Sequence, residues 1–106
     1  MKLLTRELER RFAEVGNQDE KGYDALVVAR YFHPAGSWTW YATEYSPKER
    51  EFFGYVCGFE DEWGCFSLDE MEEVKGPLGL GVERDLYFTE KPLREALKRD
   101  GRRYPT

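Results

Sequence analysis

Four strand-like runs follow one another between residues 25 and 66, and the segments that join them are only a few residues long. The runs are rich in aromatic and β-branched side chains, as strands are, and Pro34 and Pro47 mark two of the turns. They are Ala25–Phe32, Trp38–Tyr45, Phe52–Phe59 and Trp63–Phe66. Because a parallel crossover needs a dozen or more residues, these short connections predict an antiparallel meander.

Two helices are predicted on either side of the four runs. Thr5 is a suitable N-cap for an amphipathic segment whose apolar residues recur at helical spacing, and Gly16 ends that segment. Ser67 and Glu70 form the capping-box pattern that begins a short helix, which we expect to end near Gly76. Each helix has an apolar face, which we expect to pack on the sheet.

The last third of the chain predicts a loop, a strand and a third helix. Residues 76–81 are glycine-rich and are expected to form a loop, followed by a short strand over Val82–Phe88. Pro92 suits the first turn of a helix that continues to about Arg99. The expected fold is therefore α+β: an antiparallel sheet of four or five strands, with three helices packed mainly on one face. At 106 residues the chain forms one domain, residues 1–106.

The charge balance is acidic, with 16 basic and 21 acidic residues and a net charge of -5. This argues against nonspecific nucleic-acid binding, which depends on neutralising phosphates. Residues 84–106 nevertheless hold seven basic and four acidic groups. We interpret that excess as cations near a helix C-terminus, where they complement the helix dipole. The alternative is a nucleic-acid contact through Lys98, Arg99, Arg102 and Arg103.

Neither a signal peptide nor a membrane-spanning run is visible, and we expect a cytoplasmic protein that makes no membrane contact. The two cysteines do not form a secreted disulfide framework. A hairpin turn near Asp61 would bring Cys57 opposite Cys65, and we expect neighbouring free thiols rather than a disulfide. The only histidine, His33, is distant from both, so we predict no metal or cofactor.

The second run is the first candidate for a binding surface. Under strict alternation Trp38, Trp40 and Glu44 share one face, whereas Tyr41 lies on the other. Tryptophan and tyrosine combine a large apolar area with a polar group, which suits binding sites. The alternative is that one of these faces is core.

The triplet Glu83, Arg84 and Asp85 is the second candidate. On a strand the two carboxylates share one face, where they would bind a metal or divide acid and base roles, and Arg84 would hold an anion. The alternative is solvated charge on an edge strand, or a structural ion pair. Glu44 joins this group only if the fold brings it close.

Several segments together carry a family resemblance. They are residues 38–44, 53–58, 64–68, 76–79 and 83–88, within a match from Leu3 to Leu93. In this ordered set the chain resembles the family catalogued as domain of unknown function 2958. The resemblance implies a small bacterial protein of the kind often encoded on plasmids and conjugative or phage-like elements. It brings no established activity and no catalytic residues, and Gly81 stands where similar sequences are expected to have proline.

We therefore expect a non-enzymatic binding module of a mobile element that engages a host protein or a small polar ligand. Its predicted surface contains Trp38, Trp40, Tyr41, Glu44, Glu83, Arg84 and Asp85. The alternative is a metal-dependent phosphoester hydrolase that uses the carboxylates of Glu44, Glu83 and Asp85.

Overall fold

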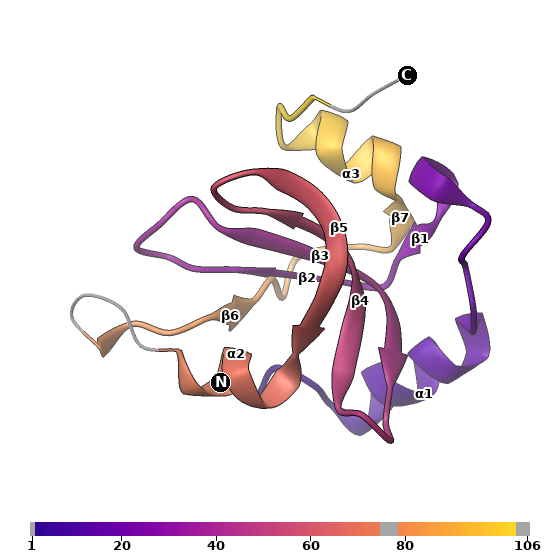
Figure 1. Ribbon diagram of the computed structural model, residues 1–106, viewed down its shortest axis with the longest axis horizontal. Coiled ribbons are helices and arrows are strands. Elements are labelled where there is room, and N and C mark those ends of the chain that lie inside the picture. The colour runs from indigo at the N-terminus through magenta and orange to yellow at the C-terminus, as the bar shows by residue number, and fades with distance from the viewer. Residues whose placement is uncertain (1, 75–78, 104–106) are drawn as a thin grey trace.

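The computed structural model describes residues 2–74 and 79–103 (Figure 1). Its helices are α1 (Arg6–Val15), α2 (Leu68–Glu73), α3 (Leu93–Arg99) and the 3₁₀ turn η1 (Gly22–Asp24). Its strands are β1 (Leu26–Val27), β2 (Ala29–Phe32), β3 (Thr39–Ser46), β4 (Glu51–Cys57), β5 (Asp61–Ser67), β6 (Glu83–Arg84) and β7 (Lys91–Pro92). In these residues no helix has both the length and the apolar character needed to cross a membrane.

The main sheet has five antiparallel strands in the order β5-β4-β3-β2-β6. Strands β2 to β5 are neighbours both in sequence and in space, so the predicted meander and the α+β class are confirmed. Strand β6 returns from the far end of the chain to pair with β2, with Arg84 opposite Tyr31. Strands β1 and β7 pair separately as a small antiparallel sheet.

Two predicted strands differ from the observed ones. The run Ala25–Phe32 is divided at Val28, because its first part pairs with β7 and its second part with β3. The predicted strand Val82–Phe88 ends after β6, because Asp85 begins a turn in which its Oδ1 accepts the Tyr87 N–H at 3.0 Å. Residues 75–78, which include the first half of the loop predicted over residues 76–81, lie outside the described residues.

The helix starts follow the local sequence. Leu8 N–H donates to Thr5 Oγ1 at 3.1 Å, which confirms the first N-cap. Glu70 N–H donates to Ser67 Oγ at 3.2 Å, but α2 ends at Glu73, before the predicted end near Gly76. Pro92 caps α3 instead of lying in its first turn.

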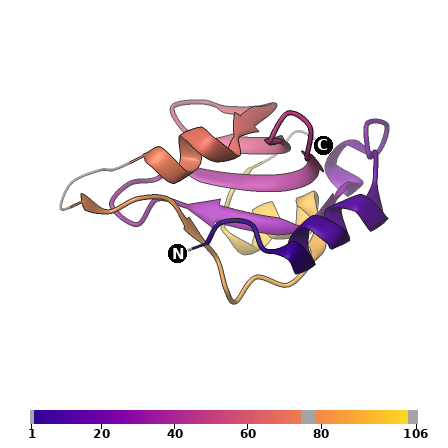
Figure 2. The same cartoon turned by 90° about the horizontal axis from the view of Figure 1, so that it is seen from below.

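The helices cover both faces of the sheet, and two of the three share one face (Figure 2). The α1 and α2 helices pack on one apolar cluster, which is centred on the fully buried Phe52. The α3 helix packs with Leu93, Ala96 and Leu97 on a second cluster around Tyr41. Since adjacent residues of a strand point to opposite faces, Tyr41 and its neighbour Ala42 belong to different clusters.

The β4–β5 register places the two cysteines apart. Cys57 lies opposite Asp61, whereas Cys65 lies opposite Phe53, and both are free. The predicted juxtaposition of the two thiols is therefore wrong. The strands close around a turn of only three residues, 58–60, and this fixes the pairing four residues away from the one that was expected.

The two thiols are expected to react very differently with a disulfide reagent such as Ellman's reagent. Cys57 is fully buried, and this burial raises the pKa of its thiol to about 12. Cys65 is exposed on β5. We expect one thiol equivalent per chain in the native protein and two in denaturant. Loss of the native reaction in Cys65→Ser would assign it, and native reactivity in that variant would contradict the buried state of Cys57.

Candidate functional site

The seven predicted site residues lie in separate parts of the molecule. Trp38 stacks on Trp40, with ring centroids 5.8 Å apart, and meets Phe59 edge-on at 5.3 Å. Gly58 makes room for this group, since a Cβ there would lie 2.3 Å from the Trp38 ring. Trp40 packs against the α1/α2 cluster. The tryptophan pair thus belongs partly to the core, and only Phe59, 94% exposed, stands fully in solvent.

Tyr41 and Asp85 lie on the α3 face, where Arg30 connects them. Arg30 Nη1 lies 3.2 Å from Asp85 Oδ2, and its Nε lies 2.9 Å from Asp100 Oδ2. The Tyr41 hydroxyl donates to Asp100 as well. Tyr41 is fully buried, and burial raises the pKa of this hydroxyl, which keeps it protonated as a donor. Tyr41 of the second run and Asp85 of the charged triplet are therefore linked through two residues, Arg30 and Asp100, that the sequence motifs did not single out.

Glu44 has a structural partner at the other end of β3. Its Oε2 accepts the Gln18 N–H at 3.0 Å. The buried Gln18 amide in turn donates to Leu26 O and Thr43 O, both at 2.8 Å. Glu44 thus helps to hold the segment after α1 against the sheet.

The three carboxylates of the hydrolase alternative are not gathered. Glu83 pairs with Phe32, which pairs with Thr39, and Glu44 lies five residues further along β3. At about 3.3 Å per residue this is a separation of roughly 16 Å along the strand. No three His, Cys, Asp or Glu side chains form a metal-binding group within residues 2–74 and 79–103.

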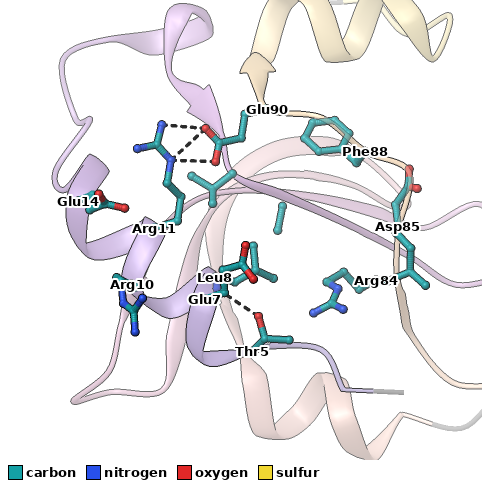
Figure 3. A pocket seen from close by; sticks show the side chains of 13 residues that line it. Thr5, Glu7, Leu8, Arg10, Arg11, Glu14, Arg84, Asp85, Phe88 and Glu90 are labelled. Carbon is teal, nitrogen blue, oxygen red and sulfur yellow. Dashed lines mark hydrogen bonds and ion pairs between the residues drawn. The ribbon is translucent and has the colours of Figure 1, made fainter.

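Arg84 points into an open groove between α1 and residues 84–90, with a volume of about 540 Å³ (Figure 3). The charged side chains that line it are of both signs: Glu7, Arg10, Arg11, Glu14, Arg84, Asp85 and Glu90. At one end Arg11 donates to both carboxylate oxygens of Glu90, at 2.9 to 3.1 Å. This bidentate pair connects α1 to the segment before β7 across the groove.

An exposed hydrophobic turn lies at the rim of this groove. Leu86 is 61% exposed and Tyr87 is 89% exposed. The turn is fixed by Asp85, whose Oδ1 accepts the Tyr87 N–H and whose carbonyl accepts the Phe88 N–H. The Phe88 ring is in turn covered by the Lys91 ammonium, 4.4 Å from its centroid. The sequence indicated a strand here, so the exposure of these two residues was missed.

Groove and turn together combine exposed apolar side chains with charges of both signs. Large apolar side chains held in solvent beside polar groups are typical of interfaces, where tyrosine is enriched among the residues that carry affinity.

Comparison with known proteins identifies the family. The model of the family described as "Protein of unknown function (DUF2958)" matches residues 3–99. Searches of the curated proteins and of the solved structures returned no significant match. The match includes every helix and strand of the fold, from α1 to α3. The chain therefore belongs to the DUF2958 family.

Proposed function

We propose that this protein is a non-catalytic binding module that engages a partner protein through the groove and the Leu86–Tyr87 turn. The observation that carries the proposal is the exposure of two large apolar side chains on a turn that Asp85 holds in place. A fixed turn loses little conformational entropy on binding, so its buried area contributes more fully to affinity.

The mixed charges of the groove support a protein as the partner. Cations and anions both line it, among them Arg10 and Glu14 on α1 and Arg84 on β6. A polyanion such as nucleic acid favours a surface of one sign, whereas a protein partner can match both. The charged rim then selects the partner, and the apolar turn supplies affinity.

The family resemblance gives the proposal its biological setting. Proteins of this kind are expected on mobile elements, so we propose a cytoplasmic accessory protein whose partner belongs to the host. The net charge of -5 suits an inhibitor that competes with nucleic acid for a basic site on a host enzyme.

Native mass spectrometry of tagged protein drawn gently from a bacterial lysate tests the proposal. The wild-type chain is expected to retain a stoichiometric protein companion, and the double variant Leu86→Ser, Tyr87→Ser to lose it. Phe59→Ser is the control, because Phe59 is about as exposed as Tyr87 but lies in the β4–β5 turn. It is expected to keep the companion.

Two results would contradict the proposal. A companion that survives the double variant would place the interface elsewhere. Equal loss in Phe59→Ser would show that capture depends on general surface hydrophobicity. Replacement of the companion by a small-molecule adduct would favour the ligand-binding form of the hypothesis instead.

A further inference from the structure

A second cavity, of about 460 Å³, lies on the other side of β2, where the β2–β3 hairpin meets the residues after α3. Its lining contains two arginines, Arg30 and Arg102, and the aromatic rings of Phe32, His33 and Trp38. No carboxylate is among the described residues that line it. The lining of this cavity is therefore positively charged, although the chain as a whole has a net charge of -5.

The two arginines differ in how their charge is compensated. Arg30 forms ion pairs with Asp85 and Asp100. Arg102 is half-buried, and in the part of the chain that the structure describes it forms no ion pair. Its Nη2 donates to Ser37 O at 3.3 Å and to Thr39 Oγ1 at 3.2 Å, which holds the guanidinium at the hairpin.

One donor of Arg102 is left over. Its Nε is buried and has no hydrogen-bond partner among residues 2–74 and 79–103. A buried donor without an acceptor is destabilising, and a half-buried cation gains from a nearby anion. An oxyanion in the cavity would neutralise the guanidinium and accept hydrogen bonds from it.

We propose that this cavity binds a small phosphate-type oxyanion through Arg102. His33 also lines the cavity, and its Nδ1 accepts the Ala35 N–H at 3.2 Å, which leaves Nε2 as the ring's donor. The rings of Phe32 and Trp38 form flat apolar walls that suit a planar group attached to the phosphate. The site is independent of the groove at α1 and of the partner proposed there.

The site is tested by titration with inorganic phosphate, with chloride as the reference salt at the same ionic strength. The readout is NMR of the arginine Nε–H groups. The Arg102 Nε–H resonance, assigned by its loss in Arg102→Gln, is expected to shift with saturable dependence on phosphate. Arg102→Gln is expected to weaken binding about tenfold or more, which corresponds to one charge-assisted hydrogen bond. Arg103→Gln removes the same charge one residue away and is expected to bind normally.

A second pair of variants keeps the test informative if Arg102→Gln folds poorly. Gly36 lines the cavity without positive φ, so Gly36→Asp is sterically allowed and adds a repelling carboxylate. Gly64→Asp, on β5, is its control. Phosphate stabilises many proteins by exclusion, so equal responses in all variants, or an unmoved Arg102 resonance, would overturn the proposal. Stronger binding of adenosine monophosphate than of adenosine and phosphate would assign the anion to a nucleotide.

Discussion

Replacement of Gly54 by alanine is expected to lower the free energy of unfolding by about 3 kcal/mol. A Cβ at this position would lie 1.9 Å from the carbonyl oxygen of Tyr41 on the neighbouring strand. Side chains can move aside, but this atom belongs to the backbone of the central strand β3, at the place where a bulge follows Ala42. The two strands must therefore separate locally, and they lose packing on both faces of the sheet.

Chemical denaturation of Gly54→Ala measures the effect, and Gly64 provides the control. Gly64 is paired directly opposite Gly54 on β5, yet a Cβ there has no neighbour within 4 Å. Gly64→Ala is expected to be neutral or slightly stabilising, because alanine restricts the unfolded chain. Equal losses in the two variants would show that both strands need the backbone flexibility of glycine. The close approach of Gly54 to Tyr41 would then not be the cause.

Local features of this fold were predictable, and distant pairings were not. The meander follows from short connections, and the caps at Thr5 and Ser67 follow from patterns within three residues of each helix start. The division of the run at Val28 depends on β7, more than sixty residues away. The end of β6 depends on a hydrogen bond that the Asp85 side chain accepts. The aromatic residues after Asp85 favoured a strand, so this turn was not predicted.

The candidate sites show the same limit. Aromatic and charged residues were singled out from the sequence, but the partners of the charged ones lie far along the chain. Arg30 joins Asp85 and Asp100, which are 55 and 70 residues away. Arg11 joins Glu90 across 79 residues. Composition indicates that such charges exist, whereas only the folded chain decides which of them are paired and which, like Arg102, retain an unused donor.

The Asp100 carboxylate is expected to be the most important charged group for stability, and Asp100→Ala to cost about 2 to 3 kcal/mol. One oxygen accepts from Arg30 Nε at 2.9 Å and from the hydroxyl of fully buried Tyr41. Its removal leaves a buried hydroxyl without its acceptor and leaves Arg30 with Asp85 alone. Thermal or denaturant unfolding measures the loss. Glu95→Ala, an exposed charge on the same helix, is expected to change stability by about 0.5 kcal/mol or less.

A double-mutant cycle separates the hydroxyl from the ion pair. Tyr41→Phe removes only the donor, so in the Asp100→Ala background it is expected to cost less than in the wild type, by about 1 kcal/mol or more. Additive losses would mean that the two side chains do not depend on each other. The hydroxyl and the ion pair would then stabilise the fold independently. A positive coupling would instead show that the polar network on this face, which joins β2, β3 and the end of α3, stabilises the fold as one unit.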